Sequence, residues 1–217
     1  RHRAAPGPLS RPMLRIIRWV AWGAVGVVGF LLLATTGGWL VTDGPLAPPR
    51  SATGPGTLAI GGPFSLTDHR GRAVTERDFR GRPMAVFFGF THCPEVCPTT
   101  LYEMSSNLVA LGDAAKDFSV FFITVDPARD TVDTMKDYVS NFDPRIEALV
   151  PTEEQLKQLV SDFRVYYAKV PTSDGGYTMD HTATIFLFDR TGAFAGTIGY
   201  GEAPAMREAK LEKLLGR

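Results

Sequence analysis

Cysteine is scarce in this chain: its 217 residues include only two. Two cysteines exclude a disulfide-rich scaffold and any metal site built from four thiolates. Net charge is absent as well, because 23 Lys and Arg side chains balance 23 Asp and Glu side chains. Without an excess of positive charge the chain lacks the electrostatic signature of nucleic-acid binding, so we expect no nucleic-acid partner. Hydrophobic residues are plentiful at 44%, which excludes a wholly disordered chain.

The charges that cancel in the sum are unevenly placed along the chain. Residues 1–18 contain five arginines and no acidic residue, which leaves residues 19–217 with a net charge of −5. No charged residue occurs between Arg18 and Asp43, a stretch of 24 residues. A membrane-spanning helix needs about 20 apolar residues, so this stretch is typical of a transmembrane helix.

We therefore expect residues 19–42 to form a transmembrane anchor and residues 1–18 a basic cytoplasmic tail. A cleaved signal peptide has a shorter apolar region, of about 7–15 residues. Trp19, Trp22 and Trp39 lie near the two ends of the run, where aromatic rings favour the lipid headgroups. Positive residues stay on the cytoplasmic side, so the rest of the chain is expected on the outer, periplasmic side of the inner membrane. A buried helix of a soluble protein is the alternative.

A linker and one folded domain are expected after the anchor. Residues 43–57 contain four prolines and three glycines, which predicts a semi-extended linker. In residues 58–217, apolar runs of strand length alternate with helical segments. This alternation predicts an α/β domain with a central sheet and helices on its faces.

The pattern also predicts individual elements. Strands are expected within 64–74, around a turn at 69–71, and at 84–90, 118–125, 184–188 and 193–198. Helices are expected at 98–111, 131–141, 152–170 and 205–215, with Asp130 or Thr131 and Thr152 as N-caps.

The two cysteines, Cys93 and Cys97, lie within five residues of each other. They follow an apolar strand and come just before an expected helix, where α/β sheets place their chemistry and where the helix terminus favours a thiolate. On a helical turn, residues four apart lie on one face, with Cβ atoms about 5–6 Å apart. Both sulfurs can then bind one metal ion or form a disulfide. A metal site, a redox-active dithiol and a structural disulfide are all compatible with this spacing, although so short a disulfide loop stabilises little.

A metal bound by two thiolates needs a further ligand, and the chain has four histidines: His2, His69, His92 and His181. His2 lies in the tail, His69 is expected in a solvated turn, and His92 would point away from the cysteines on an extended chain. His181 precedes the strand expected at 184–188, which would lie beside the cysteine-bearing strand. A ligand role and a structural role suit it equally. Two thiolates and one imidazole favour Cu(I) or Zn(II) over Mg²⁺ or Ca²⁺.

Three motifs together resemble the Sco/SenC family: FGFTHCPEVCPTTL at 88–101, VDPARDT at 125–131, and DHT at 180–182 before a strand. The resemblance covers about residues 60–215, and the N-terminal anchor matches too. It implies a thioredoxin-like domain with a central mixed sheet. It also implies that copper is bound by Cys93, Cys97 and His181, as Cu(I) with Cu(II) as a second oxidation state.

The resemblance implies a function for this site. Family members deliver copper to the binuclear copper centre of cytochrome c oxidase subunit II, or reduce the cysteines that will form that centre, and Cys93 and Cys97 would perform this redox step. Asp126 resembles the family's acid close to the site. From the residues alone, the alternative is a turn at the end of a strand, in which Arg129 and Asp130 act as local caps and pairs. The stretch before the histidine, with a Ser-Asp-Gly-Gly turn at 173–176, is expected to be a mobile loop.

Two other functions compete with that of a metallochaperone. A metal-independent thiol–disulfide oxidoreductase would need both cysteines but not His181. A peroxidase needs one peroxidatic cysteine, and it needs neither a second cysteine four residues on nor a distant histidine. Substitution of His181 separates the first alternative from the metallochaperone.

Overall fold

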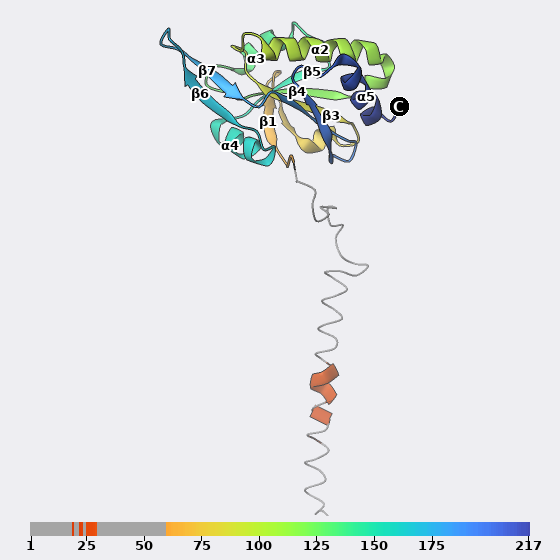
Figure 1. Ribbon diagram of the computed structural model, residues 1–217. Coiled ribbons are helices and arrows are strands. Elements are labelled where there is room, and N and C mark those ends of the chain that lie inside the picture. Colours follow the sequence, from red (N-terminus) through yellow and green to blue (C-terminus); the bar gives the residue numbers. More distant parts are fainter. Residues whose placement is uncertain (1–18, 20–21, 24, 30–59) are drawn as a thin grey trace, which may run out of the picture. The chain divides into compact units, whose positions relative to one another are not determined.

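The computed structural model of the protein describes Trp19, residues 22–23, residues 25–29 and residues 60–217 (Figure 1). The chain divides into two units, Arg1–Thr57 and Leu58–Arg217. In the first unit, the described residues are helical. None of the helices formed by described residues combines the length and the apolar character needed to cross a membrane.

Most residues of the predicted anchor at 19–42 lie outside the described residues. The predicted tail at 1–18 and the predicted linker at 43–57 lie outside them entirely.

The second unit is built around a seven-stranded mixed sheet of order β2-β1-β5-β4-β3-β8-β9. Its strands are β1 (Ser65–Asp68), β2 (Ala73–Thr75), β3 (Met84–Gly89), β4 (Ser119–Thr124), β5 (Ile146–Val150), β8 (Thr184–Phe188) and β9 (Phe194–Gly199). Strands β3, β4 and β5 are parallel, and β8 runs antiparallel to β3. Every residue of β3 and β4 is buried, as befits central strands covered on both faces.

Helices cover both faces of this sheet, with α2 and α3 above it and α4 below it in Figure 1. The helices are α2 (Val96–Leu111), α3 (Val132–Val139), α4 (Glu153–Asp162) and α5 (Pro204–Leu215). Two short 3-10 helices also occur: η1 (Glu76–Phe79) between β2 and β3, and η2 (Gly112–Ala115) between α2 and β4. This arrangement confirms the α/β domain predicted from the alternating pattern.

Two of the expected helix caps are confirmed. The hydroxyl of Thr131 accepts a hydrogen bond from the Thr134 amide at 3.2 Å and starts α3. Thr152 and Gln155 form a reciprocal capping box at the start of α4. Each threonine thus satisfies an amide that has no acceptor inside its helix.

The helix expected at 152–170 is wrong in its second half. Helix α4 ends at Asp162, and Arg164 then adopts a left-handed backbone with φ of 57°. The following run is rich in aromatic and β-branched residues, which favour strands. It forms β6 (Tyr167–Pro171), which pairs with β7 (Tyr177–His181) in a separate two-stranded sheet. The segment expected to be a mobile loop is therefore this hairpin, and β5 is a further strand that was not predicted.

Helix α2 also begins earlier than predicted. It starts at Val96, so Cys97 lies inside its first turn and not just before it. Pro98 is compatible with this position because the amides of the first helical turn have no intrahelical acceptor to lose.

Candidate metal centre

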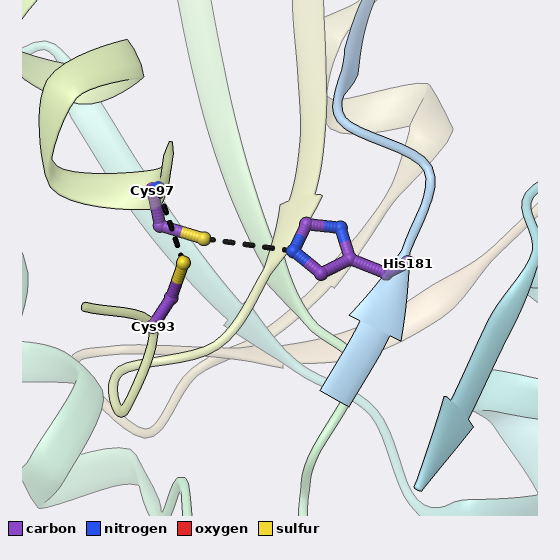
Figure 2. Close-up of side chains that lie close together, drawn as sticks. All are labelled: Cys93, Cys97 and His181. Carbon is purple, nitrogen blue, oxygen red and sulfur yellow. Dashed lines mark hydrogen bonds between the residues drawn. The ribbon is translucent and has the colours of Figure 1, made fainter. Parts of the chain in front are cut away.

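The three predicted ligands meet beyond the C-terminal end of β3 (Figure 2). Cys93 lies in the loop after β3, Cys97 in the first turn of α2, and His181 at the end of β7. Their ligand atoms all lie within 4.8 Å of one another, and Cys97 Sγ is 3.7 Å from His181 Nε2. Among the residues that the structure describes, no other His, Cys, Asp or Glu joins this group.

The two thiols differ in exposure. Cys97 is fully buried at 0% exposure, whereas Cys93 is only partly buried, and both are free. The Cys97 amide donates a hydrogen bond to Cys93 Sγ at 3.3 Å, which holds the first thiol over the start of α2. The solvent-facing side of the site therefore belongs to Cys93 and to His181, which is also partly exposed.

The thiols also differ in acidity. A hydrogen bond from the Cys97 side chain is the largest influence that lowers the pKa of Cys93, to about 4; backbone amides act in the same direction, and burial opposes them. The same hydrogen bond, together with burial, raises the pKa of Cys97 far above its ordinary value. At neutral pH the pair therefore carries one negative charge and keeps one proton between its sulfurs.

The imidazole of His181 is held in one orientation. Its Nδ1 lies 3.1 Å from the carbonyl oxygen of Thr182. A carbonyl only accepts hydrogen bonds, so Nδ1 carries the proton and the lone pair of Nε2 faces the thiols. The ring also packs edge-on against Phe90 and Phe87, with centroids 5.8 and 6.4 Å away. A ring that is held in one orientation by a hydrogen bond from its other nitrogen is typical of a metal-binding histidine.

Gly89, the last residue of β3, makes room for the buried thiol. A Cβ atom at this position would lie 2.7 Å from Cys97 Sγ and 2.6 Å from a ring carbon of Phe122. Gly89 was not among the predicted site residues. The available signal was a glycine inside an otherwise apolar strand, which often marks a close approach.

Asp126 does not belong to the three-ligand cluster. Its carboxylate is 1% exposed and accepts hydrogen bonds from the Arg129 guanidinium and from the Tyr177 hydroxyl, the latter at 3.0 Å. Since Tyr177 lies on the same hairpin as His181, Asp126 contacts the histidine-bearing segment and neither sulfur.

Asp130 does more than cap a turn. Its buried carboxylate accepts hydrogen bonds from the amide and the hydroxyl of Thr91, at 3.1 and 2.6 Å, and from the hydroxyl of Thr124 at 2.6 Å. Thr91 stands two residues before Cys93, so Asp130 holds the loop that carries the first thiol. Sequence reasoning missed this role because the partners are far apart in the chain.

His69 and His92 lie away from the cluster, and one prediction about the histidines is wrong. His92 is half-exposed, and its Nδ1 lies 3.0 Å from the Thr91 hydroxyl. His69, expected in a solvated turn, is buried, and its Nδ1 accepts a hydrogen bond from the Ala148 amide at 3.2 Å. Burial lowers the pKa of His69. The pairing of β1 with β5 covers this side chain. His2 lies outside the described residues.

Sequence comparisons match this chain to one family. The SCO1/SenC family model matches residues 52–216. The chain is 37% identical over 139 residues to an SCO2-like protein of Rickettsia prowazekii, covering 63% of this chain and 68% of that protein. It is 37% identical over 147 residues to the human mitochondrial SCO1 homolog, covering 66% of this chain and 49% of that protein. It thus spans about half the length of the human relative.

Solved structures show the same fold. Copper-bound ScoI of Bradyrhizobium japonicum matches with a TM-score of 0.67 and 49% identity, over 72% of this chain and 99% of that one. Copper-bound ScoI of Arabidopsis thaliana matches with a TM-score of 0.69 and 33% identity, over 73% and 99%. The domain therefore has the thioredoxin-like fold, a central mixed sheet with flanking helices. The family match covers more than half of the chain, and together with these relatives it shows that the chain belongs to the SCO1/SenC family.

Proposed function

We propose that this protein is a copper metallochaperone that binds copper through Cys93, Cys97 and His181. The observation that carries the proposal is the meeting of three ligand atoms within 4.8 Å in a site that is partly open to solvent. Two sulfurs and one imidazole nitrogen form a soft ligand set that suits Cu(I), and Cu(II) is the second oxidation state that we propose for the cargo. Relatives of this chain have been solved with copper bound.

The acidity of the two thiols sets the proton balance of binding. Cys93 is already a thiolate at neutral pH, whereas Cys97 keeps its proton. When Cu(I) binds both sulfurs, the Cys97 proton leaves and the ion takes its place. His181 contributes the lone pair of Nε2, the ring nitrogen that does not face the Thr182 carbonyl.

Transfer proceeds by ligand exchange from the exposed side of the site. A partner that offers its own thiolates reaches the copper past Cys93 and His181, because Cys97 is fully buried. The exposed ligands are therefore the first to be replaced, and Cys97 is the last to release the ion.

The partner that we propose is the binuclear copper centre of cytochrome c oxidase subunit II, which this protein would load with copper or prepare by reducing its cysteines. We further propose that residues 19–42 anchor the protein once in the inner membrane, with the tail at 1–18 in the cytoplasm. The linker at 43–57 would then hold the domain at 58–217 on the periplasmic side. Protease protection of vesicles tests this topology: cleavage of the domain only from the cytoplasmic side would contradict it.

Copper loading of matched histidine variants tests the ligand set. The reduced full chain, purified in detergent, should bind one Cu(I), with two sulfur ligands and one nitrogen ligand by X-ray absorption. His181→Ala should weaken binding sharply, whereas the control His92→Ala, which alters a histidine outside the cluster, should leave the affinity unchanged. Full affinity in His181→Ala would exclude the three-ligand site.

A second function, thiol–disulfide exchange without a metal, is favoured by the unequal thiols. The Cys93 thiolate would attack one sulfur of a partner disulfide and form a mixed disulfide, releasing the other partner sulfur as a thiolate. Cys97 would then lose its proton and displace the second partner sulfur. Both partner cysteines end reduced, and Cys93 and Cys97 end oxidised to a disulfide. Oxidase assembly in variants separates the two functions. If His181→Ala still supports assembly while substitution of either cysteine abolishes it, this function is favoured over copper delivery.

A further inference from the structure

The hairpin that carries His181 is separate from the central sheet. Strands β6 and β7 pair with each other, from Tyr167 opposite His181 to Pro171 opposite Tyr177, and with no other strand that the structure describes. Met179 anchors the hairpin in the core at 6% exposure, and β8 follows it along the chain. Among the described residues, no ladder of backbone hydrogen bonds ties β7 to the sheet, so side-chain contacts help to place the histidine.

Three side chains make such a contact, and we call them the clamp: Asp126, Arg129 and Tyr177. Arg129 Nη1 donates a hydrogen bond to the Tyr177 carbonyl at 3.0 Å, and the guanidinium carbon lies 3.8 Å from the centroid of the Tyr177 ring. Asp126 accepts one hydrogen bond from Arg129 Nε and another from the Tyr177 hydroxyl. Each member of the clamp therefore contacts the other two.

Two members of the clamp lie in the same turn as the residue that holds the cysteine loop. Asp126 and Arg129 contact the hairpin, whereas Asp130, the next residue, holds Thr91 in the loop after β3. A single turn after β4 thus holds both segments that carry ligands. The two contacts use different side chains: among the residues described, no side-chain hydrogen bond joins Asp130 to the clamp, and only the backbone amide of Asp130 bonds to the Asp126 carbonyl, at 3.0 Å.

We propose that the clamp positions His181 for metal binding, so that it controls copper affinity while leaving the dithiol chemistry of the cysteines unchanged. The proposal rests on the copper site proposed above. Asp126, Arg129 and Tyr177 are positioning residues, because they act on the histidine through the hairpin. Arg129 adds a second path, since its guanidinium carbon lies 5.9 Å from the centroid of the Phe90 ring, against which His181 packs.

The chemistry of the clamp explains why its residues are not interchangeable. The carboxylate of Asp126 is buried, and the Arg129 side chain is 24% exposed, so their hydrogen bonds are only weakly screened by water. A guanidinium can donate to a carboxylate and to a carbonyl at fixed angles while stacking on an aromatic ring. A lysine keeps the charge but cannot make all three contacts, and Tyr177→Phe keeps the ring while losing the hydrogen bond to Asp126.

Competition with a Cu(I)-selective chelator, using the reduced full chain in detergent, tests the clamp. Loss of a residue that orients a metal ligand typically weakens metal affinity about 10- to 100-fold. We expect Arg129→Gln to fall in this range, and Arg129→Lys and Tyr177→Phe to show smaller losses in folded protein. The equilibrium constant of the cysteine pair with glutathione should stay within about twofold of the parent value in all three variants.

Arg145→Gln provides the matched control. Arg145 pairs with Asp143 just before β5, through two hydrogen bonds of 2.7 and 2.8 Å between the side chains. This pair lies at the N-terminal ends of the parallel strands, opposite the end that carries the site. The control should lose an arginine–aspartate pair without losing copper affinity.

A double-variant cycle with His181→Ala shows whether the clamp acts through the histidine. Adding Arg129→Gln to His181→Ala should cause no further loss of affinity, because the clamped ligand is already missing. Parent-like copper affinity in both Arg129→Gln and Tyr177→Phe would overturn the proposal. So would a loss of affinity from Arg129→Gln that is as large in the His181→Ala variant as in the parent chain. Either outcome would leave the copper site itself intact. Failure of the parent chain to bind copper, or full binding by His181→Ala, would instead refute the proposed function.

Discussion

Gly89 and Cys97 are so close that no side chain fits between them: a Cβ atom on Gly89 would lie 2.7 Å from Cys97 Sγ. We expect Gly89→Ala to push the sulfur toward the other ligands and to crowd Phe122. Overpacking of this kind costs about 1–3 kcal/mol of the free energy of unfolding. Urea denaturation and Cu(I) affinity should both show the loss. Gly199→Ala is the control, since its new Cβ would meet only ordinary contact at 3.9 Å; equal effects in the two variants would contradict this explanation.

The low pKa of Cys93 predicts an unusual pH profile for its alkylation. A thiol reacts as the thiolate, and a pKa lowered to about 4 means that the thiolate already predominates above that pH. The rate with iodoacetamide should therefore change little between about pH 6 and 8, whereas an ordinary thiol gains almost tenfold per pH unit there. Cys93→Ser should leave only the slow reaction of the buried Cys97. A rate that climbs steeply over this range in the parent would disprove the lowered pKa.

Copper binding should release about one proton near pH 7. The pair starts with a thiolate at Cys93 and a protonated thiol at Cys97. Two ordinary thiols, both protonated at this pH, would release two. Calorimetry in buffers of different ionisation enthalpy counts the protons, and a count near two would show that Cys93 is protonated before the ion arrives.

Asp130→Asn should disturb the cysteine loop and spare the histidine hairpin. The buried carboxylate accepts three hydrogen bonds, two of them from Thr91, and an amide cannot accept all of them without turning its NH₂ group toward a donor. We expect a loss of about 1–3 kcal/mol in the free energy of unfolding and a shifted thiol–disulfide equilibrium. Asp117→Asn, at an exposed aspartate, serves as the control. If Asp130→Asn is destabilised but its thiol–disulfide equilibrium is unchanged, Asp130 stabilises the fold and does not affect the cysteine pair.

The sequence predicted the central strands and the cysteine pair, because local residue patterns encode them. The continuous apolar runs identified β3, β4 and β8, because buried central strands carry no polar alternation. The spacing of Cys93 and Cys97 marked a paired site, although Cys93 lies in the loop before α2 and the two residues do not share a helical turn. The order of strands then placed His181 beside them, through the antiparallel pairing of β8 with β3.

What the sequence missed depends on contacts between distant segments. The buried state of His69 follows from the pairing of β1 with β5, and β5 itself was not predicted. The sequence showed no clear end for α4, which stops at Asp162 just before the left-handed Arg164, so the residues of β6 were assigned to the helix. Tyr177 gave no signal as a partner of Asp126, since the two residues are 51 positions apart.

The hydrogen bond from His181 Nδ1 to the Thr182 carbonyl has a kinetic consequence. The acceptor is backbone of the adjacent residue, so the imidazole is oriented by folding and needs no ion to order it. Little conformational entropy is left to lose when a metal arrives. The capture rate is then governed by how fast the incoming carrier gives up its own ligands, and the speed of loading becomes a property of the donor molecule.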